Sequence, residues 1–419
     1  MRARLGPSFH RFWASAAMAN LGDGVRIVAW PWAATLLTRD PLAIAAVAIA
    51  LRLPWLVFSL PAGVITDRID RRRLIWTMDL ARAAAIGALA IALIAAPDAP
   101  PDALPPLYWA LLAGGLVVGA AEVLRDNAAQ TFLPALVDKD RLEAANGRLF
   151  SVEVLTNQMI GPPLAGFLIA FSLSFAFGTT GAGFLCAGLL VLSIRPQPTA
   201  KTCAPRRSWI AEAKEGFVFL WRNPLLRNLA LGLGALNAIY ELQLVTIVLL
   251  AQESLGLSSA EYGLLLTGAA AGGVVGGLLA APLVARLGPG TALRIMLVVT
   301  VIEMLAIGLT NSPIIVWFAL AIGSCFAVIW NTVTVSLRQR AIPSALLGRV
   351  NSVYRFFGWG MMPLGMLAAG LIMRAGEAEL GRDAALRLPY FVGAALGVLL
   401  AVAMWRTAAN ERLKDARFT

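Results

Sequence analysis

Twelve long apolar stretches constrain this chain more than any other feature of its sequence. About 20 mostly apolar residues in a helix are enough to span a bilayer core. The predicted spans are residues 11–37, 42–66, 74–96, 106–132, 143–170, 173–194, 225–251, 261–284, 292–310, 313–337, 347–373 and 385–406. Of the 419 residues, 59% are hydrophobic and only 14% are charged, which excludes an ordinary soluble domain and a disordered chain. The sequence therefore predicts an all-α membrane protein with twelve transmembrane helices.

The twelve predicted spans fall into two sets of six. A polar segment, residues 195–223, separates the sets and contains a short amphipathic stretch. One pattern recurs about half a chain apart, since Gln130–Pro134 follows the fourth span and Gln339–Pro343 follows the tenth. Such repeats are typical of transporters built from two related bundles. We expect two pseudo-symmetric six-helix bundles, 1–194 and 224–419, the second with a cytoplasmic tail. A cytoplasmic linker would join them, its short helix lying on the membrane surface.

The distribution of basic residues predicts the orientation in the membrane. Most lysines and arginines lie in alternate loops and at both ends of the chain. The opposite loops carry only Arg39, Arg374, Arg382 and Arg387. The positive-inside rule then places both termini and the linker in the cytoplasm. The net charge of +11 comes from these short clusters and not from a basic polar surface, so we expect no nucleic acid as partner. The expected location is a bacterial-type inner membrane.

Several classes of function have no motif in this sequence. The three cysteines have neither the spacing of a zinc site nor that of a disulfide framework, so we predict no metal and no other cofactor. The chain contains no phosphate-binding loop, which argues against ATP hydrolysis, and no H-E-x-x-H or G-x-S-x-G motif. We therefore expect that it is not an enzyme. A channel is a second class, which the duplicated halves disfavour.

Three motifs resemble those of the major facilitator superfamily. The loop after the second span reads Gly63-Val-Ile-Thr-Asp67-Arg68-Ile-Asp70-Arg71-Arg72-Arg73. It resembles the superfamily signature G-x-x-x-D-x-x-G-R-R/K, with Asp70 in place of the second glycine. The fifth span contains Gly161-Pro162-Pro163-Leu164-Ala165-Gly166, similar to the end of the antiporter motif, although the earlier glycines of that motif are missing. Residues 337–360 resemble the branch that includes the enterobactin exporter and macrolide-efflux proteins.

The resemblance implies the major facilitator fold and a gating role for the loop. Asp67 would face the N-terminus of the eleventh helix, where a helix dipole favours an anion, and would lock the two halves together. Arg71 would pair with Asp126 at the cytoplasmic end of the fourth helix, and Arg68 and Arg72 belong to the same gate. The alternative is that the basic cluster is only a topology signal.

Charged side chains within the spans are the candidate path residues, because ionisable groups are costly in hydrocarbon. Asp23 with Arg26, and Glu122 with Arg125, are spaced i,i+3 and can share a helix face. The remaining candidates for the substrate or proton path are Glu153 and Asn157 in the fifth span and Glu241 in the seventh. The resemblance places the first, fourth and seventh helices around the cavity.

Static ion pairs are the alternative interpretation of the path residues, and Glu241 could pair with Arg355 in this way. The other charged residues in the spans have different predicted roles. We predict structural roles for Arg52 and Arg82, and a structural or lipid-facing role for Glu303.

These features together favour a secondary active transporter that works by alternating access. We expect proton-coupled efflux of a small amphipathic organic molecule, either drug-like or siderophore-like, because a carboxyl group shielded from water can exchange a proton with substrate. The partners would be this substrate, protons and the lipid bilayer, and the protein would be a monomer. A lipid or lysophospholipid transporter of the same fold and a facilitative uniporter are the alternatives.

Overall fold

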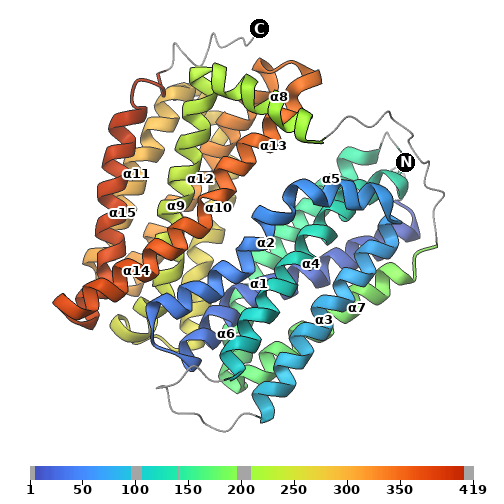
Figure 1. The fold of residues 1–419 in the computed structure, drawn as a ribbon, viewed down its shortest axis with the longest axis horizontal. Coiled ribbons are helices and arrows are strands. Elements are labelled where there is room, and N and C mark those ends of the chain that lie inside the picture. Colours follow the sequence, from blue (N-terminus) through green and yellow to red (C-terminus); the bar gives the residue numbers. More distant parts are fainter. Residues whose placement is uncertain (1–4, 96–105, 139–140, 196–208, 410–419) are drawn as a thin grey trace. The chain divides into compact units, whose positions relative to one another are not determined.

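The computed structural model divides the chain into two compact units, each of which is described by itself (Figure 1). The described residues are 5–95, 106–138, 141–195 and 209–409, and these ranges contain helices and no strand. Unit 1 comprises Met1–Cys203 together with Leu257–Leu264, and unit 2 comprises Ala204–Gly256 together with Leu265–Thr419. Residues 196–208 of the predicted linker lie outside the described part of the chain.

The helices of unit 1 follow the first six predicted spans. They are α1 (Pro7–Leu37), α2 (Pro41–Arg68), α3 (Arg71–Ala95), α4 (Pro106–Phe132), η1 (Leu133–Ala135), α5 (Leu142–Glu153), η3 (Val154–Ile160), α6 (Gly161–Phe171) and α7 (Leu173–Leu192). Within the unit, α3 packs against α4 and α7, and α1 packs against α6 and α7. The fifth predicted span is thus one long helix in which α5 continues through the π-helical segment η3 into α6.

The helices of unit 2 are α8, which lies in the predicted linker at its short amphipathic stretch, and those of the last six predicted spans. They are α8 (Trp209–Arg222), α9 (Pro224–Leu249), η4 (Leu250–Ser254), α10 (Ser259–Leu287), α11 (Pro289–Leu309), α12 (Pro313–Ala341), α13 (Ser344–Gly360), α14 (Met362–Leu380) and α15 (Arg382–Met404). The first turns of α10 are the segment that groups with unit 1. In unit 2, α11 packs against α12 and α15, and α9 packs against α14 and α15.

Local sequence signals fix where several helices begin. Proline occupies one of the first two positions of α1, α2, α9, α11 and α12, where its missing N–H costs no hydrogen bond. Asp40 caps α2 by accepting a hydrogen bond from the Leu42 N–H at 3.1 Å. Asn223 caps α9 through the N–H groups of Leu225 and Leu226.

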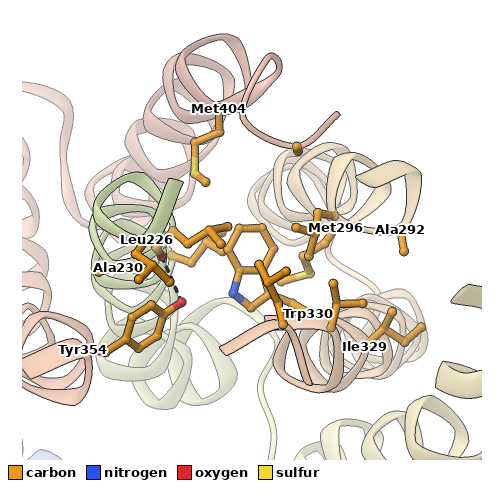
Figure 2. Close-up of a cluster of buried hydrophobic side chains, with 14 of the residues drawn as sticks. Leu226, Ala230, Ala292, Met296, Ile329, Trp330, Tyr354 and Met404 are labelled. Atoms are coloured by element: carbon orange, nitrogen blue, oxygen red, sulfur yellow. Dashed lines mark hydrogen bonds between the residues drawn. The ribbon is translucent and has the colours of Figure 1, made fainter. Parts of the chain in front are cut away.

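Unit 2 has a hydrophobic core around Trp330 of α12 (Figure 2). Side chains from α9, α11 and α15 surround it, including Leu226, Met296 and Met404. Tyr354 of α13 is buried at the edge of this core, and its hydroxyl donates to the Leu229 carbonyl at 3.1 Å. This hydrogen bond satisfies the only polar atom that the tyrosine ring brings into the core.

Eleven helices in the described residues are long and apolar enough to cross a membrane. The first predicted span is not among these eleven. It corresponds to α1, which is 31 residues long but carries ionisable residues along its length, among them Asp23 and Arg26. Large apolar side chains point outward from several spans, such as Leu278 of α10 and Val402 of α15. An exposed apolar surface of this kind suits contact with lipid.

Candidate functional site

A cluster of charged side chains lies inside unit 1 between α1, α3 and α4. We call it the charge cluster, and it consists of Asp23 and Arg26 of α1, Asp79 and Arg82 of α3, and Glu122, Arg125 and Asp126 of α4. The three helices each carry an acid followed three residues later by an arginine. Because i and i+3 positions lie on the same helix face, each helix presents both charges to the other two.

The contacts of Arg26 and Arg82 join α1 to both partner helices. The Arg26 Nη2 atom lies 2.7 Å from Glu122 Oε2 on α4 and 3.3 Å from Asp23 Oδ1 on its own helix. Arg82 Nη1 of α3 donates to both carboxylate oxygens of Asp23, at 3.1 and 3.2 Å. Asp23 is therefore held by two arginines, whereas Glu122 contacts one arginine that it shares with Asp23.

Arg125 closes the cluster between α4 and α3. Its Nε atom lies 3.5 Å from Asp79 Oδ1, and Asp79 also pairs with Arg82 on its own helix. Its Nη1 atom lies 3.4 Å from Asp126 Oδ1. Each pair of the three helices is thus linked by one interhelical ion pair, so movement of any one helix must break at least one of them.

Burial makes these contacts energetically important. The side chains of Asp79 and Arg82 are 0% exposed, and that of Glu122 is 13% exposed. The Arg82 guanidinium also lies 4.0 Å from the ring centre of Phe184 on α7. Removing one member of a buried ion pair leaves the other charge uncompensated, which costs about 3–5 kcal/mol. Asp126 differs, because its side chain is 38% exposed.

Two glycines beside Asp23 let α1 approach its neighbours closely. A Cβ atom on Gly24 would clash with the Asn157 carbonyl oxygen of η3, and one on Gly161 would lie 2.5 Å from the Gly24 Cα. A Cβ on Gly22 would meet the Phe184 ring at 2.9 Å. The glycine that begins the antiporter-like motif therefore packs against the backbone next to Asp23 and helps to set its position.

The other residues of the antiporter-like motif lie along the same helix. Pro162 and Gly166 are buried in α6, and the Gly166 carbonyl accepts a hydrogen bond from Ser259 Oγ at 3.1 Å. Glu153 lies at the end of α5 and is exposed, while Asn157 is partly buried within η3. π-Helical segments often occur at functional sites. Glu153 forms no ion pair among the described residues.

The loop after α2 ties together the ends of several helices in unit 1. Gly63 lies in the last turns of α2, and Arg68 is exposed at its end. Arg72 donates to the carbonyls of Val191 and Leu192 at the end of α7. Cations at helix C-termini are favoured by the helix dipole.

Asp70 stands where the superfamily signature has a glycine, and it caps α3. Its Oδ1 atom accepts a hydrogen bond from the Arg73 N–H at 2.8 Å, and its carbonyl accepts one from the Leu74 N–H. The departure from the signature thus supplies a helix cap.

The pairing predicted for Arg71 is wrong. Arg71 Nη1 donates to the Thr131 carbonyl at 3.0 Å, near the end of α4, and Asp126 pairs with Arg125. The carbonyls of the last helical turn have no partner within their helix, so they compete well for a nearby guanidinium. Asp67 is the last acidic residue of α2, but its side chain lies outside the described part of the structure. Its gating role stays a prediction.

Sequence reasoning missed Asp79 and assigned Arg82 only a structural role. Both are fully buried members of the charge cluster. Glu122 has the i,i+3 spacing to Arg125 noted in the sequence, but its ion-pair partner is Arg26 of another helix. The sequence does contain a signal for Asp79 and Arg82, since they have the same i,i+3 spacing as the pairs in α1 and α4. Glu241, the remaining predicted path residue, is buried on α9 in unit 2.

Comparison with known proteins decides the family. Residues 5–416 match the model of a family described as transmembrane secretion effectors, which is part of the major facilitator superfamily. The chain belongs to this family. It is therefore a multi-pass membrane protein, and the predicted superfamily membership and twelve-helix fold class are confirmed.

The curated relatives of this chain are efflux proteins. It is 29% identical to the multidrug efflux pump Tap of Mycolicibacterium fortuitum over 370 residues, which cover 85% of this chain and 87% of Tap. It is 31% identical to the enterobactin exporter EntS of Citrobacter koseri over 300 residues, which cover 70% of this chain and 67% of EntS. These relationships support transport as the activity of the family.

Solved structures share the fold at low sequence identity. A point mutant of the nucleoside transporter NupG has a TM-score of 0.79 and 13% identity, with 96% of this chain and 99% of that chain covered. A bacterial homologue of the iron transporter ferroportin has a TM-score of 0.77 and 17% identity, with 97% and 100% covered. At such identities the likeness concerns the fold alone.

Proposed function

We propose that this protein is a proton-coupled exporter of small amphipathic organic molecules. It works by alternating access in a bacterial inner membrane, as a monomer with both termini in the cytoplasm. The observation that carries the proposal is the charge cluster, which links three helices of unit 1 through buried ion pairs. The efflux relatives Tap and EntS support export as the direction of transport and an organic molecule as the substrate.

The balance of charge in the cluster supports proton coupling. Four carboxylates and three arginines are in contact, so the fully ionised cluster carries one excess negative charge. A single proton, or one cationic group of a substrate, cancels that charge. Proton and substrate therefore compete for the same carboxylate, which is the simplest basis for antiport.

Glu122 is the proton carrier in this proposal. Among the described residues, its one ion-pair partner is Arg26, which is shared with Asp23. Asp23 is held by Arg82 as well, so it stays ionised when Arg26 moves away. If a substrate or a helix movement separates Glu122 from Arg26, the buried carboxylate loses its ion-pair partner and takes up a proton from water.

A pair of neutral variants tests this assignment in proteoliposomes that contain the purified protein. The probe is ethidium, an amphipathic organic cation, and the control is Glu379→Gln, which removes an exposed carboxylate on α14. We expect Glu122→Gln to keep ethidium exchange at equal concentrations on both sides and to lose accumulation driven by a pH gradient. Asp23→Asn should impair exchange itself, because it leaves Arg82 with one partner fewer.

Two results would overturn the proposal. If Glu122→Gln accumulates ethidium in response to a pH gradient at the wild-type rate, Glu122 does not carry the proton. If both variants behave as the control does, the charge cluster is a static support. Transport of a fluorescent lysophospholipid in place of ethidium by the wild-type protein would favour the lipid-transporter alternative.

A further inference from the structure

Unit 2 contains a buried glutamate whose surroundings differ from those of the charge cluster. Glu303 lies on α11 and is only 9% exposed. Its carboxyl group lies against the backbone of α12, where a Cβ atom on Gly323 would clash with both carboxyl oxygens. The missing side chain at position 323 therefore makes the space that the carboxyl group occupies. A lipid-facing position, one of the two roles expected from sequence, does not fit this burial.

The polar partner of Glu303 is Gln243 of α9. The Gln243 amide Nε2 donates to Glu303 Oε1 at 3.1 Å, and Gln243 is 2% exposed. The Oε1 atom of Gln243 is buried and has no hydrogen-bond partner among the described residues. A buried acceptor without a donor costs about 1–3 kcal/mol, so this arrangement is one donor short.

The described part of the chain places no cation beside the Glu303 carboxyl group. Within the described residues, no lysine or arginine nitrogen lies within ion-pair distance of Glu303. The ionisable side chains on α11 and on the helices that surround Glu303 are Arg294 of α11, Arg227, Tyr240 and Glu241 of α9, Cys325, Arg338 and Arg340 of α12, and Arg382, Asp383, Arg387 and Tyr390 of α15. Arg387 binds carbonyls at the end of α11, and Arg294 binds the Trp405 carbonyl.

A proton on Glu303 removes both the uncompensated negative charge and the missing donor for Gln243 Oε1. An ionised carboxylate without a partner charge is so costly inside a membrane protein that such groups are usually neutral. A protonated carboxyl group supplies the O–H donor that the Gln243 Oε1 atom lacks. A carboxylic acid and a primary amide have complementary donors and acceptors, so they can pair in both directions: N–H to carboxyl oxygen, and O–H to amide oxygen.

We propose that Glu303 and Gln243 form a proton-binding site in unit 2, in which Glu303 is a neutral carboxylic acid paired with the Gln243 amide. Gly323 of α12 leaves the space that the Glu303 carboxyl group occupies, and the hydrogen-bonded pair of Glu303 and Gln243 links α11 to α9. The ligand is a single proton taken from water. The site is separate from the charge cluster and does not depend on the transport mechanism proposed above.

Infrared spectroscopy of the full-length protein in lipid membranes at neutral pH tests the proposal directly. A protonated carboxyl group has a carbonyl stretch that an ionised one lacks. We expect Glu303→Gln to lose one such band and the exposed-site control Glu379→Gln to keep it. Gln243→Leu, which removes the amide partner, should keep the band but shift it to higher frequency. An identical band in wild type and Glu303→Gln would overturn the proposal, because Glu303 would then be ionised.

Stability as a function of pH gives a second measurement that does not require a spectrum. With Glu303 neutral, the folded protein holds one proton more than the unfolded chain at neutral pH. The contribution of Glu303 to the free energy of unfolding must then fall as pH rises. Between about pH 6 and about pH 9, the apparent melting temperature of wild type should fall relative to that of Glu303→Gln. A parallel pH dependence of the two proteins contradicts the proposal. Glu122→Gln should leave the Glu303 infrared band in place. Failure of the proposed function can therefore be distinguished from failure of the Glu303 proposal.

Discussion

Replacing Arg82 with methionine should destabilise unit 1 more than any other single neutral substitution in the charge cluster. Arg82 is fully buried and pairs with both Asp23 and Asp79. Without it, the fully buried Asp79 keeps only the Arg125 contact at 3.5 Å. The expected loss is about 3–5 kcal/mol, the cost of leaving a buried charge without its partner.

Two further variants separate this electrostatic effect from lost packing. Asp126→Asn removes a charge that is 38% exposed and should cost no more than about 1 kcal/mol. The double variant Asp79→Asn with Arg82→Met removes both charges of one pair and should recover roughly 1–3 kcal/mol relative to Arg82→Met alone. The assay is thermal denaturation of the purified protein in detergent, with the monodisperse fraction as a second readout. If Arg82→Met unfolds at the same temperature as Asp126→Asn, the ion pairs contribute little and the argument fails.

Three other predictions concern packing, gating and topology. Gly161→Ala should lower the free energy of unfolding by about 1–3 kcal/mol and reduce transport, because the added Cβ would come within 2.5 Å of the Gly24 Cα. The control Gly147→Ala should change little, because its Cβ meets nothing within 4 Å. Equal stability of the two variants would refute this explanation. Asp67→Asn should shift the conformational equilibrium by about 1 kcal/mol towards the inward-facing state, and an unchanged distance distribution between spin labels on the cytoplasmic face would count against it. A variant whose single cysteine is Cys203 should react with an impermeant thiol reagent only from the cytoplasmic side, so labelling of intact cells from outside would reject the predicted orientation.

The fold was predictable from sequence because a bilayer demands long apolar helices and leaves few alternatives. The helix starts were also readable, since prolines and the caps Asp40 and Asn223 act within a few residues of where they stand. Superfamily motifs added the fold family. The π-helical segment after Glu153, which lies against Gly24 of α1, was not predictable, because no residue pattern in the sequence marks it.

The candidate site was only half predictable for a physical reason. Spacing on one helix shows which charges share a face, but it cannot show which neighbouring helix supplies their partners. Glu122 therefore pairs with Arg26 instead of Arg125, and Arg71 binds a helix-end carbonyl instead of Asp126. Asp79 and Arg82 repeat the i,i+3 spacing of the pairs in α1 and α4, so that repetition was a sequence signal that could have found them.

The most direct test of the central claim is proton movement driven by substrate. Proteoliposomes containing the wild-type protein and a trapped pH-sensitive dye receive external ethidium, with no initial pH difference and with the membrane potential clamped. Antiport predicts that protons leave as ethidium enters, so the internal pH rises, and that Glu122→Gln abolishes this rise. Ethidium entry through the wild-type protein without any change in internal pH would contradict proton coupling and identify a uniporter.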